Sequence, residues 1–152
     1  MTEQLHTREA TINDLDRVHA LLTELFTIEQ DHFNLPSEPI RNGLARVLTE
    51  GKFGTILVLE ENSEVIGMVN LQPIFSTAIG EPAILLEDYI LSERVRGQGY
   101  GSHFMNQIKA YCKAKGFKRI TLLTDEDNAG AQRFYEKNGY AFTHSILMKT
   151  ML

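Results

Sequence analysis

Residues 84–102, ILLEDYILSERVRGQGYGS, decide the fold, because a buried strand, a turn and a glycine-rich segment follow one another there. The apolar run 84–91 predicts the strand, and 92–95 predict the turn. A helix is expected to open directly after the glycines, and its first N–H groups have no intrahelical partners. Partial positive charge at a helix start favours anions, and glycine lets phosphate oxygens approach the backbone. The segment therefore predicts a pyrophosphate site, to which Arg96 adds a fixed charge with fork geometry.

Three kinds of phosphate site use a glycine-rich turn, and the flanking residues separate them. A P-loop requires Lys and then Ser or Thr after its last glycine, whereas Ser102 and His103 follow here. A dinucleotide fingerprint needs the spacing G-x-G-x-x-G and an acidic residue on the next strand. The spacing here is G-x-G-x-G, and although Asp125 ends the next expected strand, residues 126–152 are too few for the remaining units of that fold. An acyl-CoA pyrophosphate site, with the pattern Arg/Gln-x-x-Gly-x-Gly/Ala, is matched at every fixed position by residues 96–101.

A second motif lies at residues 128–140, NAGAQRFYEKNGY. Together with residues 86–91 and 96–102, this block resembles the GNAT superfamily of acyl-CoA-dependent N-acyltransferases. The two motifs stand in the family's order and at its distance, and the resemblance covers nearly the whole chain. It implies an N-acetyltransferase that uses acetyl-CoA as co-substrate.

Composition and length predict one globular domain, residues 1–152, with 43% hydrophobic and 23% charged residues. No apolar run suggests a signal peptide or a membrane span, so we expect a cytoplasmic protein without a membrane partner. The net charge of −5 argues against nucleic acid as a partner and is compatible with a cationic amine. The single cysteine, Cys112, excludes an internal disulfide and a multi-cysteine metal site, and its helical position favours a buried thiol.

Apolar periodicity and turn residues predict an α/β fold with a mixed sheet and helices on both faces. By resemblance the sheet is GNAT-like and mostly antiparallel, with two central parallel strands that splay apart to admit the cofactor. A final strand is expected within 140–151, and an interruption is expected where Pro73 meets its strand. The other expected strands are 5–10, 54–60, 65–71, 84–91 and 118–124, and the helices are 14–30, 37–50, 100–115 and 128–137.

The cofactor-binding residues are expected in three places. The phosphate turn is built largely from backbone and comprises Arg96, Gly97, Gln98, Gly99, Tyr100, Gly101 and Ser102. By resemblance, the backbone of Tyr89, Ile90 and Leu91 pairs with the pantetheine arm as an added strand does. Asn128 matches a family position near that arm, and helix capping is an equally good interpretation of it.

Two residues are candidates for catalysis. By resemblance, Tyr135 matches the family's general acid. A tyrosine with a pKa near ~10 stays protonated at neutral pH and can donate to a thiolate whose thiol has a pKa near ~8.5. The alternative is an aromatic that merely packs beside Phe134. Glu87, within a Leu-Glu-Asp run shared with the polyamine-type branch, is the candidate general base, while some members of the family need no dedicated base. Asp88, on the opposite side of the strand, is interpreted as structural.

The acceptor amine is expected between the first two helices, near Glu29, His32 and Phe33, although a solvated loop explains these residues as well. No metal site is predicted, because no histidine has partners at ligand spacing. The amine can be a small molecule or belong to a peptide, and a homodimer is left open. Two functions fit: acetyl transfer by direct attack in a ternary complex, and a non-catalytic acyl-CoA-binding sensor or scaffold.

Overall fold

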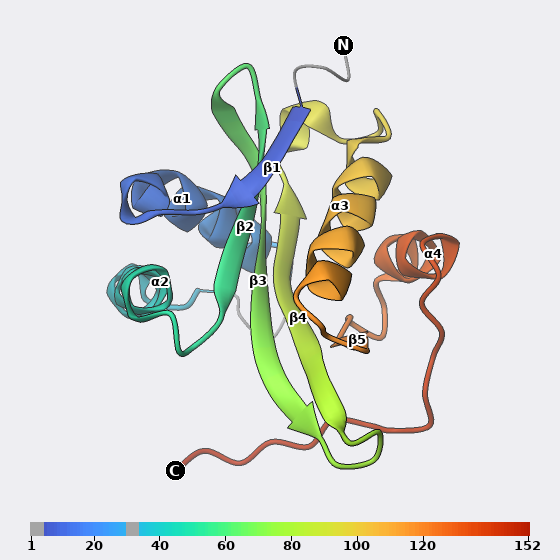
Figure 1. Ribbon diagram of the computed structural model, residues 1–152. Helices are drawn as coiled ribbons and strands as arrows, with labels where there is room; N and C mark the ends of the chain where they lie inside the picture. Colours follow the sequence, from blue (N-terminus) through green and yellow to red (C-terminus); the bar gives the residue numbers. More distant parts are fainter. Residues whose placement is uncertain (1–4, 30–33) are drawn as a thin grey trace.

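The computed structural model describes residues 5–29 and 34–152 and shows one α/β domain on a five-stranded sheet with the order β1-β2-β3-β4-β5 (Figure 1). Every strand pair is antiparallel except β4–β5, which is parallel. The elements are β1 (Leu5–Glu9), the 3-10 turn η2 (Ile12–Asp14), α1 (Leu15–Phe26), α2 (Ser37–Glu50), β2 (Thr55–Glu61), β3 (Glu64–Ser76), β4 (Glu81–Leu91), η4 (Glu93–Val95), α3 (Tyr100–Ala114), β5 (Ile120–Leu122) and α4 (Ala129–Lys137).

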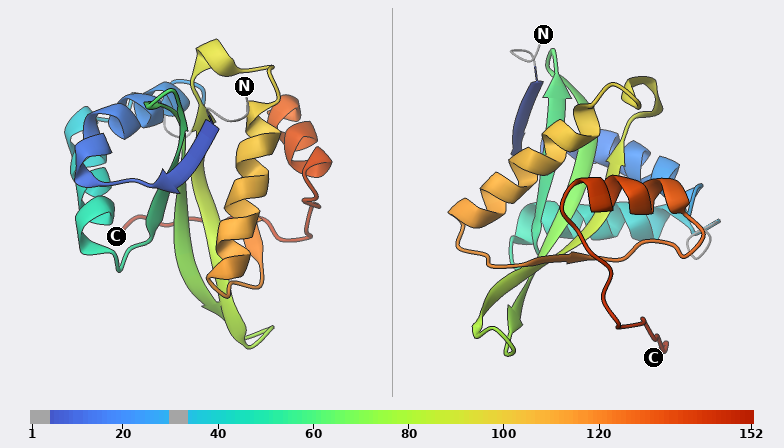
Figure 2. Two further views of the ribbon diagram at one scale, coloured as in Figure 1. Left: turned by 45° about the horizontal axis from the view of Figure 1, so that its top comes forward. Right: turned by 90° about the vertical axis from the view of Figure 1, so that its right-hand side faces the viewer.

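Helices cover both faces of the sheet, as the fold class predicted (Figure 2). On one face, α1 and α2 bury Val18, Leu21 and Leu44 against inward-facing residues of β2 and β3. On the other face, α3 buries Phe104 and Ile108 against the opposite set of strand residues. Strand residues alternate between the two clusters because successive side chains point to opposite faces. Both faces of the central strands are therefore apolar, which matches their near-continuous hydrophobic sequences.

The strands depart from expectation at two places. β3 continues through Pro73 to Ser76, so the expected interruption is wrong. The last β2 partner of β3 is opposite Leu71, so Pro73 lies where β3 has an open edge in the described chain and a missing N–H is tolerated. β4 begins at Glu81, three residues early, because the β3–β4 ladder extends to the Ser76–Glu81 pair.

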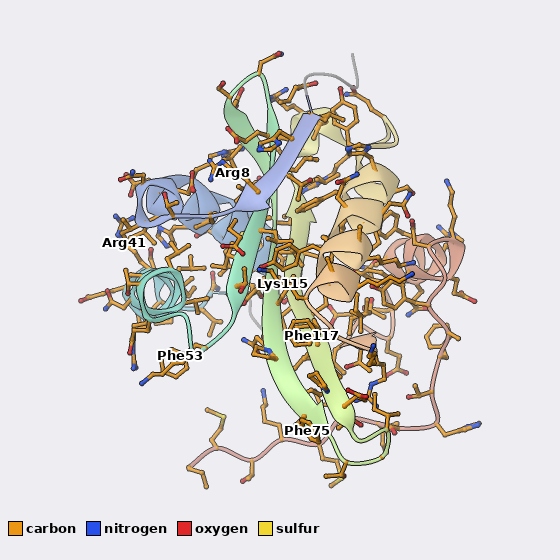
Figure 3. The ribbon with its side chains drawn as sticks, in the orientation of Figure 1. Arg8, Arg41, Phe53, Phe75, Lys115 and Phe117 are labelled. Atoms are coloured by element: carbon orange, nitrogen blue, oxygen red, sulfur yellow. The ribbon has the colours of Figure 1, made fainter. Side chains whose placement is uncertain are left out.

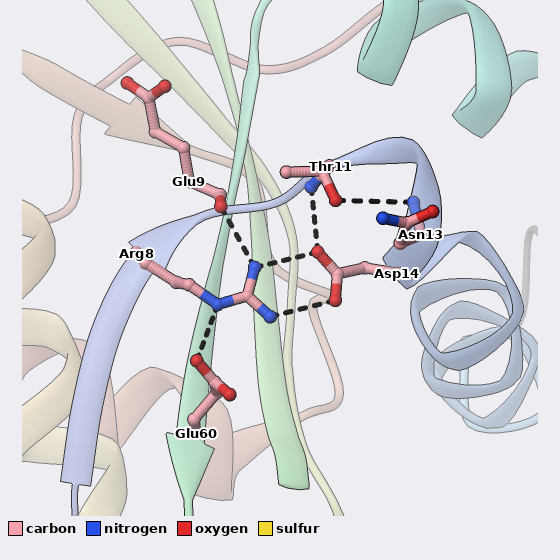
Figure 4. Close-up of polar contacts among 6 residues, drawn as sticks. All are labelled: Arg8, Glu9, Thr11, Asn13, Asp14 and Glu60. Atoms are coloured by element: carbon pink, nitrogen blue, oxygen red, sulfur yellow. Dashed lines mark hydrogen bonds and ion pairs between the residues drawn. The ribbon is translucent and has the colours of Figure 1, made fainter. Parts of the chain in front are cut away.

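An ion-pair network ties the start of the chain to the sheet (Figure 4). Arg8 on β1 donates two hydrogen bonds to the Asp14 carboxylate, at 2.8 and 2.9 Å, and one to Glu60 on β2, at 2.5 Å. Asp14 also accepts from the backbone N–H of Thr11 in a capping box. The Arg8 guanidinium holds the pKa of Asp14 below its usual range. The network fixes the corner between β1 and α1.

The final strand expected within residues 140–151 is wrong. Residues 141–152 form no helix or strand, and their large side chains are exposed, with Ile146 and Met148 each 87% exposed. Apolar residues alone do not make a strand, because a strand needs a neighbouring edge to complete its hydrogen bonds. β5 is also shorter than expected, at three residues. In the described ranges, no helix is long and apolar enough to cross a membrane.

Candidate functional site

The β4–β5 pair opens beside the end of β4. The two strands are paired only from Ile84 to Leu86. Beyond Leu86, the edge of β4 that faces β5 has no strand neighbour among the residues that the structure describes. The Leu91 carbonyl accepts from Arg96, whereas the edge before it can pair with an extended ligand, and the cofactor-binding role of Tyr89, Ile90 and Leu91 stays a prediction.

The glycine turn leads from this edge into α3. Gly97 and Gly99 adopt left-handed conformations, with φ of 77° and 82°, which glycine adopts without strain. Gly99 is the N-cap of α3, and no side chain caps the helix. A Cβ built at either glycine would meet nothing within 4 Å, so the space over the turn is open. The first N–H groups of α3 thus face a space where an anion can bind.

The side chains of the turn are mostly engaged in holding it in place. Arg96 donates to the carbonyl of Leu91 at 3.0 Å and to the Glu24 carboxylate of α1 at 2.8 Å. Gln98 donates to the carbonyl of Arg94. The charge of Arg96 is therefore shared with Glu24, and the turn would bind phosphate chiefly through its backbone.

The next two side chains anchor α3 to its neighbours. Tyr100 donates to Glu61 at 2.6 Å, and this hydrogen bond raises the pKa of Tyr100. Ser102 accepts from Asn138, which also donates to the carbonyl of Phe134, so α3 and α4 are joined beside the turn. A Cβ built at Gly101 would lie 3.1 Å from the Phe134 ring, so a larger residue there would require the ring to move by a few tenths of an ångström.

A β-bulge interrupts β4 at Asp88. Glu87 is opposite Asn70 and Ile90 is opposite Met68, so Asp88 and Tyr89 together oppose a single residue of β3. Asp88 adopts a left-handed φ of 56°. The extra residue changes which face each following side chain points to.

The bulge assigns Glu87 and Tyr89 to opposite faces. Glu87 pairs with Asn70, whose neighbours along β3 belong to the α3-side core, so Glu87 lies on the α1–α2 side. Tyr89 instead packs into the α3-side core and donates its hydroxyl hydrogen to the carbonyl of Gly101 at 2.7 Å. Burial raises the pKa of Tyr89. Only its backbone remains for a cofactor.

Tyr135 lies in an aromatic cluster between α3, α4 and β4. Its ring makes edge contacts with Tyr89, Phe134 and Tyr140, at centroid distances of 6.3, 5.4 and 5.7 Å. Burial, with a smaller contribution from the charge of Glu29, raises the pKa of Tyr135 to about 12. The phenol is therefore protonated at neutral pH and can donate a proton, and Glu29, which follows α1, lies close enough to raise its pKa.

The remaining residues expected at the site are Asn128 and the three residues proposed to bind the acceptor amine. Asn128 is the N-cap of α4, and its side-chain oxygen accepts from the N–H of Ala131 at 3.0 Å, so the capping interpretation is confirmed. Its role near a cofactor stays a prediction. His32 and Phe33 lie outside the described residues, and Glu29 follows α1 on the side of the sheet where Glu87 lies.

A separate cavity of about 310 Å³ opens near the C-terminal end of α3, away from the glycine turn. Its lining includes Lys115 and Phe117, which follow α3 (Figure 3), and it also includes Glu9. It shares no residue with the expected site. Over the described ranges, no three His, Cys, Asp or Glu side chains gather as metal ligands would.

Sequence reasoning missed three residues that shape the site. Glu24 pairs with Arg96 from the other side of the sheet, Asn138 joins α4 to the turn, and Asp88 forms the bulge. The first two depend on tertiary contacts and carried no local signal. The tolerance of aspartate for left-handed φ was the one available hint of the bulge.

Comparisons with known proteins agree with this geometry. Residues 15–140 match the sequence model of the acetyltransferase (GNAT) family. The chain is 30% identical over 148 residues to the aminoalkylphosphonate N-acetyltransferase of Salmonella typhimurium, covering 95% of this chain and 90% of that protein. It is 35% identical over 102 residues to the uncharacterized N-acetyltransferase YhfO of Bacillus subtilis, covering 64% of this chain and 68% of that one. A crystal structure of a possible acetyltransferase from Clostridium difficile superposes with a TM-score of 0.86 at 18% identity, covering 98% of this chain and 99% of that one.

Proposed function

The chain belongs to the acetyltransferase (GNAT) family, and from this premise we propose that it transfers an acetyl group from acetyl-CoA to a primary amine by direct attack in a ternary complex. The observation that carries the proposal is the opening between β4 and β5, which runs directly to the uncapped start of α3. An extended thioester arm and a pyrophosphate need these two features side by side.

The residues present fit acetyl-CoA. The free edge of β4 offers backbone groups to the pantetheine amides, and α3 offers backbone N–H groups to the pyrophosphate. Gly97 and Gly99 leave the space over the turn clear. When bound, acetyl-CoA would supply an activated thioester carbonyl, and Tyr135, whose ring packs against Tyr89 of β4, would be the nearest of the two proposed catalytic side chains to an arm held on that strand.

Two side chains move the protons. The ammonium form of the acceptor first loses a proton to solvent, because only the neutral amine has a lone pair. Glu87, on the side of the sheet that α1 and α2 cover, then accepts a second proton from that nitrogen as it attacks, directly or through a water molecule. Tyr135 Oη donates its proton to the departing sulfur as the C–N bond replaces the C–S bond. Solvent then carries a proton from Glu87 back to Tyr135, which restores both groups for the next turnover.

The acceptor is proposed to be a small or peptide amine that carries positive charge in solution. Glu29 brings a carboxylate close to Tyr135, and an anionic group at that point favours a cation. The Salmonella relative is an aminoalkylphosphonate N-acetyltransferase, so aminoalkylphosphonates are among the acceptors worth testing. The proposal includes the cytoplasmic location expected from the sequence, since acetyl-CoA is an intracellular metabolite, and it includes neither a nucleic acid nor a membrane partner.

A thermal-shift titration with acetyl-CoA, CoA and NAD, followed by thiol-release assays with an amine panel, tests the proposal. NAD is the control, because it carries a pyrophosphate without a pantetheine arm. A ligand that binds only the folded protein stabilises it by about 2.7 kcal/mol at 100 times its dissociation constant. We expect stabilisation by acetyl-CoA and CoA, none by NAD, and thiol release that depends on an amine.

The outcomes separate the parts of the proposal. Stabilisation without thiol release, on a panel spanning polyamines, aminoglycosides, aminoalkylphosphonates and lysine peptides, favours a non-catalytic acyl-CoA sensor. No response to either form of CoA overturns the assignment of the glycine turn.

A further inference from the structure

One hydrogen bond joins the two ends of the segment that contains the glycine turn. The chain leaves the end of β4, passes through η4 and the glycines, and returns along the sheet as α3 (Figure 1). The hydroxyl of Tyr89, near the end of β4, donates to the carbonyl of Gly101, in the first turn of α3, at 2.7 Å. The two residues are 12 positions apart, so this bond closes a loop that holds the whole of residues 90–100.

Packing fixes where the phenol of Tyr89 points. Its ring stacks on Phe104 of α3 and on Phe134 of α4, with both centroids 5.7 Å away. A side chain packed against two neighbouring elements has little rotamer freedom left. Burial also raises the pKa of Tyr89, so its hydroxyl keeps the proton that it donates. The hydroxyl is therefore a fixed donor aimed at the start of α3.

Gly101 lets the start of α3 come close to this phenol. A Cβ built at Gly101 would lie 3.5 Å from the Tyr89 hydroxyl oxygen and 3.1 Å from the Phe134 ring. A side chain at this position would press on that ring. The distance between β4 and the first turn of α3 is thus set by contacts that a small change would disturb.

The two ends of the closed loop belong to the two halves of the proposed cofactor site, and the inference rests on that proposed function. The pantetheine arm would lie on the backbone of residues 89–91, and the pyrophosphate at the first N–H groups of α3. One molecule that makes both contacts gains full affinity only where their spacing matches its own length. A strand presents its hydrogen-bonding groups at its edge and its side chains to the faces of the sheet. The phenol can therefore set this spacing without touching the cofactor.

We propose that Tyr89 is a positioning residue, whose phenol holds the start of α3 at the distance from the β4 edge that CoA spans. The backbone of Tyr89 belongs to one half of the cofactor site, and its side chain fixes where the other half lies. Tyr89 acts through Gly101 and α3, and the reacting atoms are left to Tyr135 and Glu87.

The binding of CoA and of two fragments of CoA to the full-length chain tests this role. Tyr89→Phe keeps the stacked ring and removes only the donor. Pantetheine touches one half of the site, and ADP, which carries the pyrophosphate, touches the other. Because a hydrogen bond is worth roughly a fivefold change in an equilibrium constant, the Kd of CoA should rise about fivefold in Tyr89→Phe. The Kd of each fragment should change less than about twofold, since neither fragment depends on the spacing.

Tyr111→Phe is the matched control. It removes a phenol that donates to Glu9 at the other end of α3. Each variant loses one hydrogen bond, so each should lower the melting temperature by about 2–4 °C. Only Tyr89→Phe should weaken CoA binding. A merely structural role of Tyr89 would lower the melting temperature without separating CoA from its fragments.

The outcomes distinguish this role from the proposed reaction. Unchanged CoA affinity in Tyr89→Phe, or an equal loss for CoA and both fragments, overturns the positioning role, and amine-dependent thiol release by the wild type would still support acetyl transfer. A loss confined to CoA supports the positioning role even if the wild type releases no thiol with any amine. A wild-type chain that does not bind CoA overturns both.

Discussion

Replacing Tyr135 by phenylalanine should lower kcat about 10²-fold while leaving the fold and the affinity for acetyl-CoA intact. General acids contribute roughly 10²–10⁴-fold. The pKa of Tyr135 is raised to about 12, well above the ~8.5 of a thiol, so proton transfer is uphill and the low end applies. A 10²-fold loss corresponds to about 2.7 kcal/mol of transition-state stabilisation.

The structure separates this chemical effect from a structural one. The rings of Tyr89, Phe134 and Tyr140 pack against the ring of Tyr135, which phenylalanine retains, so the free energy of unfolding should change by less than about 1.5 kcal/mol. Tyr111→Phe is the matched control, since it removes a half-buried phenol that donates to Glu9 at 2.5 Å, at the other end of α3.

Steady-state thiol release across pH 6–10.5, with thermal melts of each variant, is the assay. A tyrosine with a pKa of about 12 remains protonated over this range, so Tyr135 should impose no alkaline loss of rate below pH 10.5. Full turnover by Tyr135→Phe, or an equal loss in Tyr111→Phe, would refute the assignment of the general acid.

Three further changes test the turn, the cap and the ion-pair network. Gly99→Ala should destabilise the fold by about 1–2 kcal/mol and weaken acetyl-CoA binding in titration calorimetry, because Gly99 has φ of 82°; Gly43→Ala inside α2 is the control and should not destabilise it. Asn128→Ala should cost about 1 kcal/mol of unfolding free energy, whereas Asn128→Asp keeps the capping oxygen and should not. If both variants lose acetyl-CoA affinity while Asn128→Asp keeps its stability, the side-chain amide has a role in cofactor binding. Asp14→Asn should cost about 1–3 kcal/mol in urea melts at pH 7. Since the folded-state pKa of Asp14 lies below the usual ~3.9, its stabilisation is full above about pH 4 and is lost as the pH falls through the folded value, so the variant and wild type should converge in acid.

The sequence predicted what depends on local chemistry. The glycines at 97 and 99 and the cap at Asn128 each follow from the backbone preferences of one or two residues, and both features are found. The last strand was wrong for a physical reason: a strand is completed by a second edge, and a local pattern does not specify where that edge lies.

The candidate site was likewise predictable where it depends on local sequence and not where it depends on contacts between distant segments. The resemblance located the turn and Tyr135, yet the Glu24 partner of Arg96 comes from 72 residues away in the chain. Strict alternation along β4 would have put Glu87 and Tyr89 on one face. The bulge at Asp88 separates them, because the register of β4 changes against its neighbour β3.

The extra residue at Asp88 decides which side chains of β4 face each side of the sheet. Before Asp88, odd-numbered side chains turn towards α1 and α2; after it, they turn towards α3. Deleting Asp88 would leave the composition almost unchanged and yet send the phenol of Tyr89 away from Gly101 and the Leu91 side chain out of its core. Glu87 and Tyr89, two residues apart on one strand, face opposite sides of the sheet because β4 has one residue more than β3 between the pairs that flank the bulge.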